Sequence, residues 1–371
     1  MLVATPLFER CDDSSGIVIG VFHDACALLG EIVLAAATPS GALTDAVVEV
    51  LSENGYGQYV GLIAILTPAL GAEEPAHLKQ RIEALAATPV PVPPKGKWEA
   101  VGHGSGGATS AHQMEERARK SLVEIALKDI ADAMGDADAF IAQYDPATRK
   151  VPKIAAEIAA RLLAAGRAED TLGFIGRAEV DQSRWIPRAW QGARFEVLEA
   201  LDRMADAQTF LRTCFERDLS PDYLRTFLKR LPDFEDIAAE ERALSYAMAY
   251  PIALSALLFL IHWPALDRAA QLVQQRFTEL DGNHFEILTL AAEALSARHP
   301  LAATLALRAM INFTLGAAKS SRYQDAARHL AECDALASQI GGFGRFEPDA
   351  AYVARLRREH GRKSGFWGHI A

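Results

Sequence analysis

Gly166-Arg167-Ala168-Glu169-Asp170-Thr171 follows the apolar run Leu162-Leu163-Ala164-Ala165, and this junction decides the fold. Thirty-six residues later Asp202-Arg203-Met204-Ala205-Asp206-Ala207 follows Val197-Leu198-Glu199-Ala200-Leu201, and a third copy is Ser321-Arg322-Tyr323-Gln324-Asp325-Ala326. Each copy has a turn-forming residue, then Arg, then Asp three residues on, then a small residue. Helical hairpins repeated near the tetratricopeptide period predict an all-α fold. In it, antiparallel hairpins stack as a tetratricopeptide-like right-handed superhelix.

Every position of the repeated turn has a structural role. Gly166, Asp202 and Ser321 would accept the open or left-handed backbone that a short loop between helices needs. The Asp of each copy falls in the first turn of the second helix, where the helix dipole favours negative charge. The small residue that follows lets the two helices approach closely. The motif therefore marks architecture and gives no sign of a binding site.

Composition and charge indicate which classes of protein the sequence fits. The 371 residues are 50% hydrophobic and 23% charged, which is typical of a globular chain with several cores. The net charge of -10 disfavours a nucleic-acid binder, since such proteins are usually basic. Four scattered cysteines form no CxxC pair and no disulfide framework. Together with an N-terminus that lacks a basic signal-peptide region, this predicts a cytoplasmic protein.

The N-terminal residues 1–87 predict a small helical unit. An amphipathic helix is expected over residues 17–36, and three shorter helices over residues 42–53, 59–70 and 75–86. Asp12 and Asp13 precede the first helix and supply capping oxygens. Its inner face is expected to carry Val18, Val21, Phe22, Ala25, Leu29, Ile32 and Val33.

The rest of the chain divides at a Pro/Gly-rich segment. Nine of the 24 residues in 88–111 are Pro or Gly, which predicts a linker or a long loop. Residues 112–371 then form the helical-repeat domain, which ends in a capping helix. Within it, 19 residues from Ala243 to Ile261 carry no charge, about the length of a membrane span. Pro251 at the centre favours two buried helices that meet there.

Motifs for catalysis, metal or cofactor binding are weak. His23 and Cys26 make a lone HxxC, whereas a zinc site needs three or four ligands. The Gly102–Gly107 stretch lacks the preceding strand and the GK[ST] ending of a phosphate-binding loop. The sequence therefore predicts no catalytic residue, no metal ligand and no cofactor, and it favours a binding protein over an enzyme.

The C-terminal tail is the one basic segment. Five cations against Glu359 give residues 352–371 a net charge of +4. One interpretation is a capping helix whose aromatic residues pack on the last hairpin and whose cations pair with acidic neighbours. A second is an electrostatic patch for nucleic acid or an acidic partner, and a third is an aromatic anchor for a partner. The candidate partner-binding residues are Arg355, Arg357, Arg358, Arg362, Lys363 and Trp367.

Longer stretches of the sequence carry a family resemblance. They are Phe8-Glu9-Arg10-Cys11-Asp12-Asp13-Ser14-Ser15-Gly16, Cys214-Phe215-Glu216-Arg217-Asp218-Leu219-Ser220, and His360-Gly361-Arg362-Lys363-Ser364-Gly365-Phe366-Trp367. With them the chain resembles, over essentially its whole length, the bacterial family catalogued as domain of unknown function 6880. The resemblance implies an all-helical protein and brings no catalytic residues.

These observations predict a non-catalytic scaffold that binds a protein or peptide on a helical surface. Two alternatives stay open at this point. One is nucleic-acid binding through the basic tail, and the less favoured one is an enzyme with an active site in a helical cleft. No membrane association is expected.

Overall fold

The computed structural model describes residues 7–8, 10–11, 13–36, 40–52, 54, 57–71, 73–91, 100–104, 107–181 and 186–370. It is all-α apart from one short β-hairpin, as the sequence predicts for the fold class. The chain divides into two compact units, Met1–Arg203 and Met204–Ala371. The division predicted from the sequence, 1–87, 88–111 and 112–371, stays a prediction. Within the first unit, Ala126 and Ile130 share a core with Leu78 across the Pro/Gly-rich segment.

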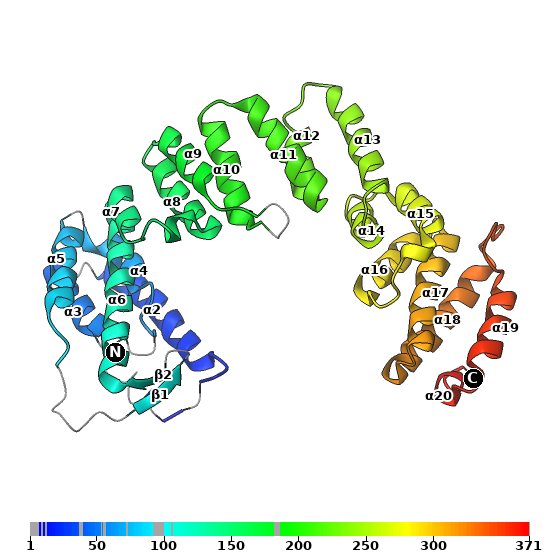
Figure 1. Ribbon diagram of the computed structural model, residues 1–371, viewed down its shortest axis with the longest axis horizontal. Helices are drawn as coiled ribbons and strands as arrows, with labels where there is room; N and C mark the ends of the chain where they lie inside the picture. Colours follow the sequence, from blue (N-terminus) through cyan, green and yellow to red (C-terminus); the bar gives the residue numbers. More distant parts are fainter. Residues whose placement is uncertain are drawn as a thin grey trace. The chain divides into compact units, whose positions relative to one another are not determined.

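The first unit begins with helices packed around α4 (Figure 1). They are α2 (Ile17–Ala35), α3 (Ser40–Ser52), α4 (Leu62–Leu70), α5 (Glu74–Ala87) and α6 (Ala111–Met134). Apart from Thr67 and Pro68, α4 consists of Leu, Ile and Ala, and such a helix is stable only when surrounded by other elements. Its leucines and Ile63 are accordingly almost wholly buried.

Short helical hairpins complete the first unit. They are built from α7 (Ala137–Ala142), η1 (Thr148–Lys150), α8 (Pro152–Ala164), α9 (Ala168–Arg177) and α10 (Arg188–Ala200). Ile158 and Leu162 of α8 are fully buried and share a core with Phe140 of α7. Burying such side chains contributes about 2 kcal/mol each, so the hairpins are held by packing more than by helix propensity.

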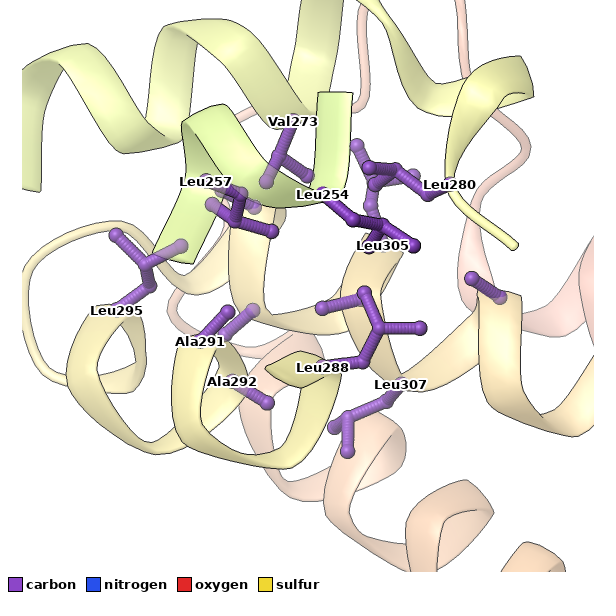
Figure 2. Close-up of a cluster of buried hydrophobic side chains, with 14 of the residues drawn as sticks. Leu254, Leu257, Val273, Leu280, Leu288, Ala291, Ala292, Leu295, Leu305 and Leu307 are labelled. Carbon is purple, nitrogen blue, oxygen red and sulfur yellow. The ribbon is translucent and has the colours of Figure 1, made fainter. Parts of the chain in front are cut away.

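The second unit is a longer series of packed helices (Figure 1). Its elements are α11 (Met204–Asp218), α12 (Pro221–Leu228), α13 (Glu235–Met248), α14 (Ala253–His262), α15 (Leu266–Gln275), η2 (Phe277–Glu279), α16 (Phe285–Ser296), α17 (Pro300–Gly316), η3 (Ser320–Arg322), α18 (Tyr323–Ala337), α19 (Asp349–His360) and α20 (Ser364–Trp367). Figure 2 shows the core where leucines of α14, α16 and α17 meet Val273 of α15. The uncharged stretch around Pro251 is split between α13 and α14, which confirms the interpretation as two helices.

Two copies of the repeated turn have the expected backbone. Gly166 and Asp202 adopt left-handed φ angles of 73° and 55°. In both, the next residue's amide donates to the carbonyl oxygen five residues earlier, at 2.8 and 2.9 Å. This bond closes a Schellman motif, which satisfies carbonyls at the end of the first helix.

The third copy of the turn corrects the prediction. Ser321 lies in the short helix η3, and the left-handed residue is Ala318, with φ of 51°. The Lys319 amide donates to the Thr314 carbonyl at 3.0 Å, so the Schellman motif closes three residues earlier than predicted. The cause is the inserted η3 turn, which separates the end of α17 from the start of α18.

The Pro/Gly-rich segment also differs from its prediction as a linker or loop. β1 (Ala100–Gly104) and β2 (Gly107–Ser110) form an antiparallel hairpin within it, while residues 92–99 and 105–106 lie outside the described residues. Ser110 then starts α6 with a capping box, in which its hydroxyl accepts from the Gln113 amide at 3.2 Å. Strands rich in Gly and Ala pair through their backbone, so they show little side-chain alternation in the sequence.

Helix α2 packs through only part of the predicted face, since Val18, Phe22 and Val33 contact the core as expected. Val21 and Ile32, expected inside, are each 63% exposed, whereas Cys26 and Gly30 are buried. A methyl group at Gly30 would lie 2.5 Å from Ile65 of α4, so glycine permits the close approach of these helices. By length and composition α2 is the one helix among the described residues that could cross a membrane. The Asp13 carboxylate caps it, whereas Asp12 lies outside the described residues.

Candidate functional site

A groove opens between α16 and α18 in the second unit, and we call it the α16–α18 groove. Its volume is about 520 Å³, which falls within the usual range for binding sites. Thr289, Ala292, Glu293 and Ser296 of α16 line one wall, Leu307 of α17 lies between, and Arg328, His329, Glu332, Ala335 and Leu336 of α18 line the other.

The sequence of α17 explains why a groove forms here. Twelve of its 17 residues are buried, because it is apolar nearly all round. It therefore packs against α16 on one side and α18 on the other. Leu307, 3% exposed, lies where the core reaches the groove. Figure 2 shows Leu307 and Ala292 at the edge of the leucine cluster. The groove thus combines an apolar floor with largely polar walls.

The polar side chains of the walls follow helical spacing. On α16, Thr289, Glu293 and Ser296 are three or four residues apart and so share one face. On α18, Arg328 forms ion pairs with Asp325 at 3.1 Å and with Glu332 at 3.7 Å. A polar face on each helix would normally contact only water, but here the two faces border one cavity.

His329 is the most deeply placed polar group of the groove. The residue is only 3% exposed, and its Nδ1 atom is buried without a hydrogen-bond partner. Burial, reinforced by the Arg328 charge, lowers the pKa of the imidazole, while Asp325 acts in the opposite direction. The ring is therefore neutral at pH 7, and it has hydrogen-bonding capacity left unused within the chain.

The surroundings of His329 do not form a nucleophilic site. Cys333 lies one helical turn further on, and burial raises the pKa of its thiol to about 12. Its Sγ donates a weak hydrogen bond to the Thr304 carbonyl at 3.9 Å. A nucleophilic cysteine needs a lowered pKa, so this thiol is unreactive at neutral pH. Among the described residues, no three His, Cys, Asp or Glu side chains are grouped to hold a metal ion.

A second, smaller cavity lies between α11, α12 and α13. Its volume is about 130 Å³, and its lining includes Phe215, Phe227 and Tyr246 together with Arg212 and Arg242. A cavity of about 150 Å³ holds a benzene ring, so this one has room for a single side chain at most. The α16–α18 groove is the better candidate for a chain segment.

The predicted tail residues are largely engaged within the chain. Arg355 pairs with Glu347 at 2.9 Å and with Glu359 at 3.1 Å. Arg357 stacks its guanidinium over the Trp367 ring, 4.4 Å from the centroid. Of these contacts, the one between Arg357 and Trp367 joins α19 to α20.

Of the remaining candidate residues in the tail, some contact other parts of the chain and others are exposed to solvent. The Trp367 indole donates to the His360 carbonyl at 2.9 Å, and Lys363 lies beside the Tyr323 ring. Arg358 and Arg362 are exposed. Under α19 and α20, Tyr352, Leu356 and Phe366 are buried, as expected of a capping helix. A binding role for the tail stays a prediction.

Sequence reasoning did not find the groove. Its residues occur in segments with no unusual motif, and each polar face looks like an ordinary solvent-exposed helix face. The single sequence signal is α17, which is too apolar to have a solvent-exposed face of its own. Helices on both sides of it could have been inferred, but not which of their residues face each other.

Fold and groove define an all-helical repeat protein with an open, polar-walled groove in its second unit. Residues 1–369 match the model described as Family of unknown function (DUF6880), and the chain belongs to this family. The resemblance inferred from the sequence is thereby confirmed. Neither the curated proteins nor the solved structures gave a match.

Proposed function

We propose that this protein is a non-catalytic helical-repeat scaffold that binds an extended segment of a partner protein in the α16–α18 groove. The observation that carries the proposal is the buried Nδ1 of His329, unpartnered in the wall of an open groove. Buried polar groups in proteins nearly always have partners, and a bound peptide backbone could supply one once the His329 ring turns toward the groove. A cytoplasmic location is part of the proposal.

The composition of the groove supports peptide binding. Leu307, Ala292 and Leu336 offer apolar contact, while Glu293, Ser296 and Thr289 offer hydrogen-bond acceptors and donors. Small-molecule sites are usually more enclosed and more apolar. An open groove with alternating apolar and polar contacts suits a chain that presents side chains and backbone groups together.

Catalysis is less well supported by the same site. Burial raises the pKa of the Cys333 thiol, and His329 has no carboxylate hydrogen-bonded to its Nδ1. A histidine general base normally has such an orienting partner. Nucleic-acid binding by the tail is also less supported, because Arg355 and Arg357 are held by Glu347, Glu359 and Trp367.

The test compares two tryptophan variants of the tagged full-length protein purified from its native host. Ala335 is exposed and lines the groove, so Ala335→Trp fills the groove without disturbing the core. Asp334 is exposed on the same helix and is not three or four residues from any groove-lining residue, so Asp334→Trp on the opposite face is the control. Mass spectrometry, with and without nuclease, identifies the bound proteins.

We expect a partner that is retained by wild type and by Asp334→Trp, is lost with Ala335→Trp, and is unaffected by nuclease. A set of partners unchanged by Ala335→Trp would overturn the assignment to the groove. Partners that disappear only after nuclease treatment would favour the basic tail instead.

A further inference from the structure

We infer that the α16–α18 groove recognises a basic segment, in which a lysine or arginine side chain lies between Glu293 and Glu332. The inference rests on the proposed function and adds the chemical class of the partner. It follows from the charges of the two walls, from the pairing of each carboxylate, and from the neutral state of His329.

The two helices that border the groove are strongly acidic. α16 carries Glu286 and Glu293, while α18 carries Asp325, Glu332 and Asp334 against one cation, Arg328. Five carboxylates against one guanidinium give a net charge of -4, with His329 neutral. The whole chain, at -10, has the same sign. A cationic partner is therefore attracted at long range and held at short range, whereas an anionic one is repelled.

Each wall presents one carboxylate to the groove. Glu293 is exposed on α16, and no ion pair to it occurs in the part of the chain that the structure describes. Glu332 lies 3.7 Å from Arg328, which also pairs with Asp325 at 3.1 Å. Because one guanidinium is shared by two carboxylates on its own helix, acceptor capacity remains in the groove. Hydrogen bonds from an ammonium or guanidinium to such carboxylates are about twice as strong as neutral ones.

His329 adds to this preference through its neutral state. A charged imidazole would repel a lysine or arginine in the same groove, but the lowered pKa keeps the ring uncharged at pH 7. The apolar residues Leu307, Ala292 and Leu336 suit the aliphatic stem that precedes an ammonium or guanidinium group. The groove therefore matches both parts of a long basic side chain.

The experiment selects binders from a display library of short random peptides on immobilised full-length protein. Peptides that also bind Ala335→Trp are discarded, so that only groove-dependent sequences remain. Among these we expect lysine and arginine to be enriched severalfold over the input library. Groove-dependent peptides without that enrichment would overturn the inference and leave the proposed function intact. A selection that yields no groove-dependent peptide would overturn both.

A charge-reversal pair then tests the two carboxylates on one selected peptide. Glu293→Lys with Glu332→Lys should weaken binding at least tenfold, because repulsion replaces attraction at two positions that contact the basic side chain. Glu286→Lys with Asp334→Lys makes the same charge change on the same helices outside the groove lining. This control should weaken binding far less. An equal loss in both double variants would show that net charge alone attracts the peptide, and would overturn the assignment to Glu293 and Glu332.

Discussion

Arg308 of α17 donates to the Asp349 carboxylate at 3.1 Å, and the two side chains are only 3% and 13% exposed. The same guanidinium donates to the Glu347 carbonyl at 2.6 Å and lies 4.2 Å from the centre of the Tyr352 ring. The Tyr352 hydroxyl in turn bonds Asn312 on α17 at 3.1 Å. One buried network thus ties α19 to α17, the helix beneath the groove.

We predict that Arg308→Ala lowers the free energy of unfolding by about 3–5 kcal/mol, because it leaves Asp349 buried and unpaired. Arg358→Ala is the control, since that side chain is 73% exposed and 4.0 Å from Glu359. Its cost should stay within about 0.5 kcal/mol. Urea denaturation of the purified variants measures both. Similar losses for the two variants would mean that the buried network does not hold the C-terminal helices.

Glycine substitutions in α2 test how that helix packs. Gly30→Ala should destabilise by about 1–3 kcal/mol, because the new methyl group would overlap Ile65. A methyl group at Gly20 would have no neighbouring atom within 4 Å. Gly20→Ala should therefore stabilise the protein by about 0.5–1 kcal/mol through helix propensity. Thermal unfolding distinguishes the two, since the changes in Tm have opposite signs. Stabilisation by both would place the packed face of α2 elsewhere.

The left-handed Ala318 predicts a stabilising substitution. A non-glycine residue in this conformation costs about 1–2 kcal/mol, so Ala318→Gly should raise the free energy of unfolding by about 1 kcal/mol. Ala317→Gly alters the preceding residue, whose φ is -82°, and should lower stability by about 0.5–1 kcal/mol. Both residues are exposed, so changes in side-chain packing contribute little to the stability of either variant. A loss of stability in Ala318→Gly would contradict the Schellman assignment.

Asp129 and Asp132 are neighbouring carboxylates on α6, and removing the charge of one should change stability in the opposite direction from removing the charge of the other. Burial, with the Asp132 charge, raises the pKa of Asp129 from 3.8 to about 6. The folded state therefore binds a proton more readily than the unfolded chain, and the ionised form is disfavoured at pH 7. Asp129→Asn should raise Tm at pH 7, and this gain should shrink as the pH falls through 6 and vanish near 4.

Asp132→Asn is the matched control for that experiment. The Asp132 carboxylate accepts from Arg161 Nε at 2.8 Å and from Nη2 at 2.6 Å. Loss of this ion pair should lower the free energy of unfolding at pH 7 by about 1 kcal/mol, because the pair is partly exposed. Scanning calorimetry between pH 4 and pH 7 gives both values. A gain from Asp129→Asn that is independent of pH would show that titration of this carboxyl is not its cause.

The outcomes show what the sequence could predict. Gly166 and Asp202 were recognisable as turn residues because few residues accept a left-handed backbone. Ala318 was not, since alanine usually favours a helix and only the inserted η3 turn forces it out of one. In α2, apolar residues occur nearly all round the helix, so periodicity alone could not select the face that packs on Ile65.

The groove shows a different limit of sequence reasoning. Glu293 and Glu332 belong to helices separated by the whole of α17, and each is an ordinary exposed glutamate in its own helix. They come to border one cavity because the apolar α17 packs between α16 and α18. The arrangement therefore depends on contacts between helices, which local periodicity does not contain.

Site-specific photo-crosslinking in the native host tests the central claim most directly, that the α16–α18 groove holds a partner segment. A benzophenone side chain is introduced at Ala335 inside the groove or at Asp334 on the opposite face of α18. We predict that irradiation gives a discrete protein adduct from position 335 and little from position 334. Adducts of equal yield from both positions, or none from position 335, would contradict the proposal.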